Sequence, residues 1–148
     1  MKKSIFFLII LLPLGLMAQT NPIPLKRAKQ VIIKTDVPAK EGYQLIIMVL
    51  KDQGYLLDQN DKIAFTATTK ERMVEKGNIK YFINVNAKDN EVIISGQSKL
   101  NCELEHAYIS PTAQYQDIEY GNSSYAKTVF RPLTKVAMAL NKPIAYNK

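Results

Sequence analysis

Residues 80–96 read KYFINVNAKDNEVIISG, and this stretch decides the fold. Apolar and polar side chains alternate along it on both sides of the turn pair Asp89-Asn90. A period of two predicts strands with one buried and one hydrated face, and such hairpins build antiparallel sheets. We therefore predict strands over residues 79–87 and 91–100. The residues expected on the buried face are Tyr81, Ile83, Val85, Ala87, Val92, Ile94 and Leu100, and those expected on the hydrated face are Asn84 and Asn86.

Three upstream stretches also predict strands. QVIIKTDV, at residues 30–37, is rich in β-branched residues, and residues 55–58 form a short strand before the turn pair Asn60-Asp61. Residues 62–74 alternate between apolar and polar side chains and end at a KGN turn. The residues of this third strand that are expected on the buried face are Ile63, Phe65, Ala67 and Met73.

Two stretches show helical spacing. Apolar residues recur at helical intervals over residues 39–53, and Gly54 suits a C-terminal cap. The second helix begins at a cap in NSS, residues 122–124, and ends at the Lys-Pro pair of residues 142–143. Pro132 is expected to kink or delay it. Its apolar stripe consists of Tyr125, Val129, Leu133, Val136, Ala137 and Leu140.

The expected order of elements is strand, helix, four strands and helix, with residues 102–121 divided between strand and loop. Each helix needs an apolar face to cover, and the hairpin sheet offers one. This order predicts a two-layer α+β domain, in which two helices pack an antiparallel sheet of about five strands. The predicted organisation is a signal peptide over residues 1–18, an N-terminal arm over 19–30 and a single α+β domain over 31–148.

The N-terminal residues predict export. Two lysines precede an apolar run over residues 5–17, and Ala18 is a small residue at a cleavage point. The run is too short for a permanent anchor, because a membrane-spanning helix needs about 20 apolar residues. We expect cleavage between Ala18 and Gln19, with cleavage after Thr20 as the alternative. Gln19 stands where a lipoprotein would carry cysteine, so we expect no lipid attachment and a periplasmic or secreted protein.

Composition narrows the partners and the chemistry. The net charge of +7 falls to +5 without residues 1–18, and the remaining lysines are scattered along the chain. A solubilising surface explains such a pattern better than a nucleic-acid footprint, so we expect no nucleic-acid partner. The single cysteine, Cys102, allows no internal disulfide. It is either buried, which we favour, or available for an intermolecular bond.

Three stretches carry a resemblance to known protein classes. They are LKDQGYLLDQNDKIAFTATT at 50–69, KYFINVNAKDNEVIISG at 80–96 and GNSSYAKTVFRPLTKVAMALN at 121–141. Their order resembles that of small signal-bearing Bacteroidota domains of unknown function, and also that of helix-grip envelope domains. The resemblance implies an envelope protein with a helix-on-sheet fold, and it implies no catalytic residues. A cystatin-like fold shares the early elements but leaves the last helix unexplained.

The residues with potential chemistry do not converge. Cys102 and His106 would share one face of a strand, with two glutamates on the other face, so at most two metal ligands meet locally. Along a strand the two residues would lie about 13 Å apart, too far for a nucleophile and its base. The sequence also lacks a phosphate-binding loop and a nucleophile-elbow motif. We therefore predict no catalytic residues, no metal and no cofactor.

Tyrosines gather in the last third of the chain. Tyr108, Tyr115 and Tyr120 lie in a polar segment, and tyrosine is enriched at interfaces. We interpret these three residues as candidate binding residues, with completion of the core as the alternative role.

The expected export and the lack of a convergent set of catalytic residues together predict a non-catalytic binding domain of the cell envelope. Its expected partner is an envelope protein. The alternative is a carrier of a small apolar molecule, held between the last helix and the sheet near Val129, Leu133 and Val136. A third hypothesis, an enzyme, requires Cys102 and His106 to meet acidic groups in one cleft.

Overall fold

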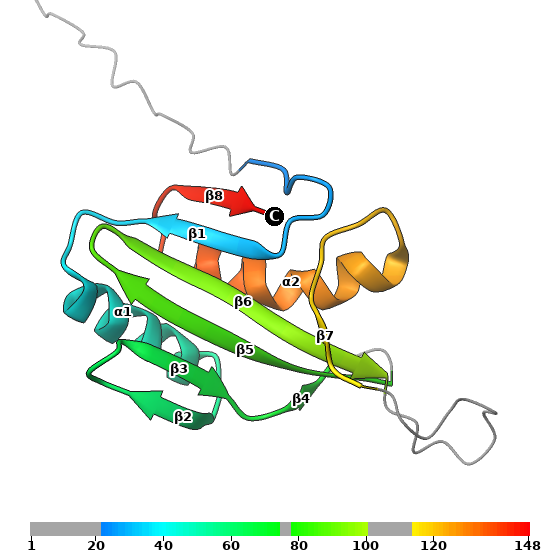
Figure 1. Cartoon of the computed structure of the whole chain (residues 1–148), viewed down its shortest axis with the longest axis horizontal. Helices are drawn as coiled ribbons and strands as arrows, with labels where there is room; N and C mark the ends of the chain where they lie inside the picture. Colours follow the sequence, from blue (N-terminus) through cyan, green and yellow to red (C-terminus); the bar gives the residue numbers. More distant parts are fainter. Residues whose placement is uncertain (1–21, 75–77, 101–113) are drawn as a thin grey trace, which may run out of the picture.

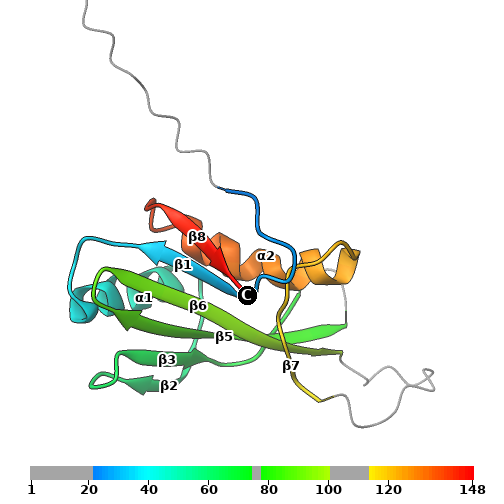
Figure 2. The same ribbon diagram turned by 45° about the horizontal axis from the view of Figure 1, so that its top comes forward.

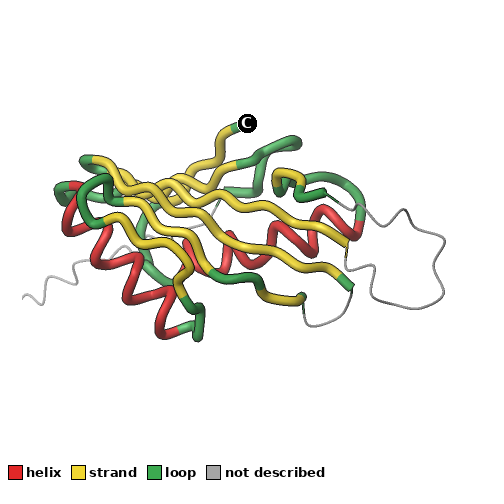
Figure 3. Tube along the Cα trace, turned by 60° about the horizontal axis from the view of Figure 1, so that its bottom comes forward, coloured by secondary structure: helices red, strands yellow, loops and turns green. Residues whose placement is uncertain are grey.

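The computed structural model describes residues 22–74, 78–100 and 114–148, and it confirms a two-layer α+β fold. Two helices pack on one face of a single eight-stranded sheet (Figure 1). Turning the molecule shows both helices on the same side of the strands (Figure 3). The elements are β1 (Gln30–Lys34), α1 (Ala39–Asp52), β2 (Leu57–Asp61), β3 (Thr66–Thr69), β4 (Arg72–Met73), β5 (Ile79–Lys88), β6 (Glu91–Leu100), β7 (Gln116–Asp117), α2 (Ser124–Met138) and β8 (Ile144–Asn147).

The β5–β6 hairpin is the centre of the sheet. The strand order is β2-β3-β5-β6-β1-β8, while β4 pairs with β5 and β7 pairs with β6. The hairpin keeps one register from Ile79↔Leu100 to Lys88↔Glu91, and every strand pair of the sheet is antiparallel. Helix α1 packs mainly on β5 and β6, and α2 packs on β1, β5 and β6 (Figure 2). The hairpin therefore carries both helices.

The buried face predicted for the hairpin is confirmed at all positions but one. Alternate residues from Ile79 to Ala87 and from Val92 to Ser98 are buried beneath the helices. Leu100 was also expected there, but it is 44% exposed, because it is the last residue of β6 and lies at the end of the sheet.

The single strand predicted over residues 62–74 is wrong. The Asp61 carboxylate accepts hydrogen bonds from the backbone N–H groups of Ile63 (2.8 Å) and Ala64 (2.9 Å), which closes a turn. Phe65 follows in the left-handed region at φ 53°, so β3 begins only at Thr66. Ile63 is consequently 92% exposed instead of buried. A second break separates β3 from β4, and it leaves Met73 half exposed.

Helix α1 ends just before Gly54 and α2 begins after Ser123, as predicted, but α2 ends at Met138 and not at the predicted Lys-Pro pair of residues 142–143. The Ser123 hydroxyl accepts a hydrogen bond from the Ala126 N–H at the start of α2. Pro132 neither delays nor ends this helix, which runs through it to Met138. Residues 144–147 form β8, which was not predicted because these four residues carry no strong strand pattern. Tyr125 was predicted to lie in the apolar stripe of α2, and this prediction is wrong, because the residue is 40% exposed.

Gly96 permits the closest packing in the core. A Cβ atom at this position would lie 2.5 Å from the Phe82 carbonyl oxygen, 3.0 Å from Ile118 Cδ1 and 3.3 Å from Leu133 Cδ2. The Gly96 carbonyl also accepts a hydrogen bond of 2.9 Å from the Ile118 N–H. The sheet, α2 and the segment after β7 therefore meet at a residue that has no side chain.

We expect Gly96→Ala to lower the free energy of unfolding by about 1–3 kcal/mol, because the new methyl group overlaps backbone that cannot move freely. Urea denaturation of the purified domain measures this change. Ser95→Ala is the matched control, since its side chain lies on the opposite face of the same strand. Equal stability of the two variants would contradict the close packing described for Gly96.

Candidate functional site

One face of the sheet carries no helix among the described residues, and we call it the open face. Figure 1 looks directly onto it, with α1 and α2 behind the strands. Its side chains are those that alternate with the buried residues along each strand. They include Gln59, Thr66, Thr68, Asn84, Asn86, Lys88, Glu91, Ile93, Ser95, Gln97, Gln30, Ile32, Lys34 and Asn147.

A shallow groove of about 570 Å³ crosses the open face. This volume lies within the range of about 300–1,000 Å³ that is common for ligand sites. Strands β1, β3, β5, β6 and β8 all contribute to it, so residues far apart in the sequence line one surface. Its lining includes Gln30, Ile32, Thr66, Thr68, Asn84, Asn86, Ile93, Ser95 and Asn147.

Neutral polar side chains form a row across the sheet. The strand registers place them side by side in the order Gln59, Thr68, Asn84, Ser95, Gln30 and Asn147. Within this row, the Thr68 hydroxyl donates to Asn84 Oδ1 at 2.9 Å, and Asn147 Nδ2 donates to Gln30 Oε1 at 3.3 Å. These bonds hold the amide groups in place. We call this set the neutral row.

Several polar groups in the groove are available to a ligand. The side chains of Thr66, Asn86 and Ser95 have no hydrogen-bond partner within the part of the chain that the structure describes. Ile32 and Ile93 are register partners on β1 and β6, and both line the groove beside the neutral row. The floor thus offers uncharged donors and acceptors together with a small apolar strip.

Charges lie toward the hairpin-turn end of the groove. Lys34 Nζ contacts Glu91 Oε2 at 2.9 Å, and this hydrogen bond is the main cause that holds the pKa of Glu91 below its ordinary value. Lys88 stands opposite Glu91 in the register of the hairpin. The charged residues of the lining therefore lie at one end of the groove, and the neutral row at its centre is uncharged.

Tyr115 forms a cluster of rings and charges at the other end of the open face. Its ring packs edge-on against Phe82 with centroids 5.0 Å apart, and Lys99 Nζ lies 4.3 Å from its centroid. The Tyr115 hydroxyl donates to Glu71, which also contacts Lys99 Nζ at 3.3 Å. We call these four residues the Tyr115 cluster.

In the Tyr115 cluster the pKa of Glu71 is lowered, which favours its charged form, and the pKa of Tyr115 is raised, which favours its neutral form. The hydrogen bond from Tyr115 is the main cause that lowers the pKa of Glu71, and desolvation is the main cause that raises the pKa of Tyr115. A carboxylate with a lowered pKa stabilises the fold above its unfolded-state pKa, and that contribution is lost as the pH falls through the folded-state value. The cluster is therefore strongest near neutral pH.

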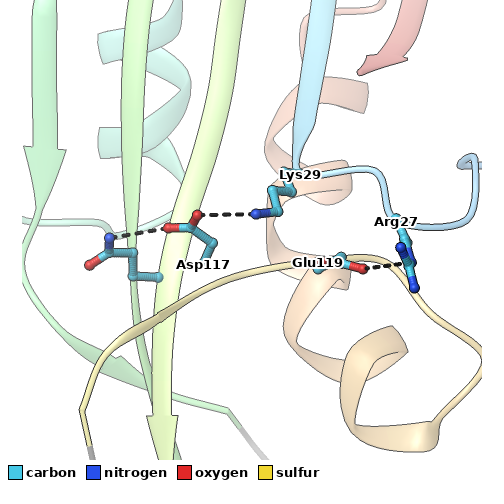
Figure 4. Close-up of polar contacts among 5 residues, drawn as sticks. Arg27, Lys29, Asp117 and Glu119 are labelled. Atoms are coloured by element: carbon cyan, nitrogen blue, oxygen red, sulfur yellow. Dashed lines mark hydrogen bonds and ion pairs between the residues drawn. The ribbon is translucent and has the colours of Figure 1, made fainter. Parts of the chain in front are cut away.

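Two ion pairs join the segment around β7 to the N-terminal segment. Figure 4 shows Asp117 between Lys29 (3.4 Å) and the side-chain amide of Gln97 (3.3 Å), and Glu119 near Arg27 (4.0 Å). Backbone hydrogen bonds connect the same two segments, since the Tyr120 N–H donates to the Ala28 carbonyl at 2.8 Å. The backbone hydrogen bonds hold these two segments together more than the ion pairs do, because the ion pairs are exposed to solvent.

The structure places the sequence-predicted residues in different surroundings. Tyr115 lies on the open face against Phe82, whereas Tyr120 packs edge-on against Phe130 of α2, at 5.4 Å between centroids. Tyr108 lies outside the described residues, as do Cys102 and His106. Residues 1–21 also lie outside them, so the predicted cleavage between Ala18 and Gln19 stays a prediction. The roles assigned to the tyrosines stay predictions as well.

The neutral row was not predicted as a site, although Asn84 and Asn86 were predicted on the hydrated face. The available signal was the succession of small and amide residues on alternate positions of three neighbouring strands. Across residues 22–74, 78–100 and 114–148, no group of three or more potential ligand residues could hold a metal ion. Neither helix of these ranges is long and apolar enough to span a bilayer.

Comparisons with known proteins find similarity at the level of structure. No protein-family model matches the sequence, and no curated protein matches it. The chain is distantly similar to the crystal structure of a TBP-like protein from Parabacteroides distasonis, with a TM-score of 0.39 and 13% sequence identity. The match covers 78% of this chain and 96% of that one. It assigns no family to the chain.

We expect Tyr115→Phe to raise the pKa of Glu71, because the variant removes the hydrogen bond that chiefly lowers it. Carboxyl ¹³C NMR over an acid titration measures the change. Glu91 is the internal control, since Lys34 lowers its pKa at the far end of the same sheet and should keep doing so. An unchanged Glu71 titration would mean that the phenol does not bind this carboxylate in solution.

Proposed function

We propose that the protein is an exported, non-catalytic binding domain of the bacterial cell envelope, and that its open face is the binding surface. The observation that supports this is the one-sided packing of the sheet. Both helices cover the same face, and the other face carries a groove whose polar groups are partly without partners. Half-exposed hydroxyls and amides on such a surface bond to water, and a ligand that carries hydroxyl or amide groups can replace that water.

The lining of the groove favours binding over catalysis. Among the described residues, the lining contains neither histidine nor cysteine, and its acidic residue Glu91 is paired with Lys34. General acid–base catalysis needs a titrating group within reach of the substrate, and nucleophilic catalysis needs an activated nucleophile. We propose neither for this surface, and the proposal includes no cofactor.

The cellular location in this proposal rests on the N-terminal residues. The lysines, the short apolar run and Ala18 form a pattern typical of a cleaved export signal. The proposed location is therefore the periplasm or the exterior of the cell, without a lipid or helical anchor. An envelope protein is the partner that the sequence alone favours.

A carrier of an apolar molecule between α2 and the sheet remains the alternative proposal. Val129, Leu133 and Val136 would line its cavity, and all three are at most 1% exposed. Leu133 also approaches the backbone at Gly96 closely. Such packing would have to open to admit a ligand, whereas the groove on the open face needs no rearrangement, so we favour the open face.

The test compares two arginine variants of the full chain, each affinity-tagged and purified gently from its native envelope. Asn86→Arg places a long charged side chain in the groove, and Gln44→Arg places the same side chain on the exposed surface of α1. We expect native mass spectrometry to detect a bound partner or ligand with the parent chain and Gln44→Arg, and at least a tenfold lower occupancy with Asn86→Arg. Equal occupancy in both variants would show that the open face is not the binding surface.

A further inference from the structure

We propose that the groove on the open face binds a neutral glycan chain. This inference rests on the proposed binding function and names the chemistry of its ligand. It depends on three features of the groove, namely its hydrogen-bonding groups, its apolar strip and its distribution of charge.

The hydrogen-bonding groups match a polyhydroxylated ligand. An amide side chain presents both donors and an acceptor, and a serine or threonine hydroxyl can act as either. A sugar hydroxyl also donates and accepts, so each hydroxyl can pair with neighbouring groups of the neutral row. Asn84 and Gln30 are already oriented by bonds to Thr68 and Asn147, while Asn86 and Ser95 are free of such bonds within the described residues. The row therefore combines fixed groups with available ones.

The apolar strip supplies the second contact that a sugar ring requires. Ile32 and Ile93 face each other across β1 and β6, and Ala145 continues the same line on β8. The C–H face of a pyranose ring is apolar, and it can cover these side chains while the ring hydroxyls reach the neutral row. Removal of such an apolar patch from water contributes favourably to binding.

The charge distribution favours a neutral ligand over an anionic one. Of the charged residues that line the groove, Glu91 is neutralised by Lys34, and Lys88 lies at the same end. A nucleic acid or an acidic polysaccharide would be matched by cations spread along the binding path. The neutral row has none along its length, which crosses the sheet for about 24 Å at ordinary strand spacing. That length suits a chain of several sugar units.

The position of the groove also argues against an extended peptide. A peptide in strand form adds to the edge of a sheet, where unpaired backbone groups can bond to it. Four of the five strands that line the groove, β1, β3, β5 and β6, are paired with strands on both sides, and only β8, which contributes Asn147, lies at an edge of the sheet. The backbone groups of these four strands are already used, so recognition must come from side chains.

The experiment exposes the purified protein to a printed array of neutral and acidic oligosaccharides. The array includes the surface polysaccharides extracted from the cells that produce the protein. Binding is then followed in solution with the best neutral glycan by ¹H–¹⁵N NMR, which observes side-chain amides directly. We expect shifts at the amides of Asn84, Asn86 and Gln30, and at least about fivefold weaker binding for Asn86→Ala, as the loss of one hydrogen bond predicts. Gln44→Ala on α1 is the matched control and should bind as the parent does.

The outcomes separate this inference from the function on which it rests. Binding to acidic glycans alone, or no glycan binding at all, would overturn the glycan assignment. If a co-purified envelope protein is lost in Asn86→Arg while no neutral glycan binds, the open face is a protein interface, so the proposed function stands and the glycan assignment falls. If a neutral glycan binds but its shifts lie away from the neutral row, the groove is not its site, which also overturns the assignment.

Discussion

The close approach of three elements at Gly96 is the constraint on which the rest of the domain depends. Leu133 of α2 and Ile118 of the segment after β7 both reach the backbone of β6 at this residue. A side chain there would separate the layers, because protein interiors are packed without room to spare. With the helix seated at Gly96, α2 covers one side of the sheet, and α1 covers the neighbouring part of the same side. No helix among the described residues covers the opposite side.

One-sided packing explains the chemistry of the open face. Its side chains do not contribute to the core, so hydrophobicity is not required of them, and amides, hydroxyls and paired charges occupy most positions. The sheet nevertheless holds these groups in a fixed register. Bonds such as that between Thr68 and Asn84 orient them further. A surface of this kind is organised before a ligand arrives, which reduces the entropy lost on binding.

Local patterns predicted the hairpin and the helices, because strand alternation is visible within a few residues and helical spacing within a few turns. Val92 and Ile94 were placed correctly by alternation, and Ser123 by its capping chemistry. The error at Ile63 arose because the Asp61 carboxylate closes a turn inside an alternating stretch, and side-chain capping overrides periodicity there. Strand β8 and the neutral row were missed for a different reason. Strand β8 is too short to show a strand pattern of its own, and the neutral row exists only through pairing between distant strands, which no short stretch of sequence contains.

The position of β1 has a consequence for the order in which the chain can be synthesised and folded. This first strand lies between β6 and β8, and Gln30 pairs with Asn147, 117 residues away. The Lys29 N–H likewise bonds to the Asn147 carbonyl at 2.8 Å. Strand β1 therefore cannot pair with β8 until residues 144–147 have been synthesised, and contacts of such long range fold slowly. Until then β1 has only β6 as a neighbour in the sheet, so this side of the sheet is completed after the β5–β6 hairpin has been synthesised.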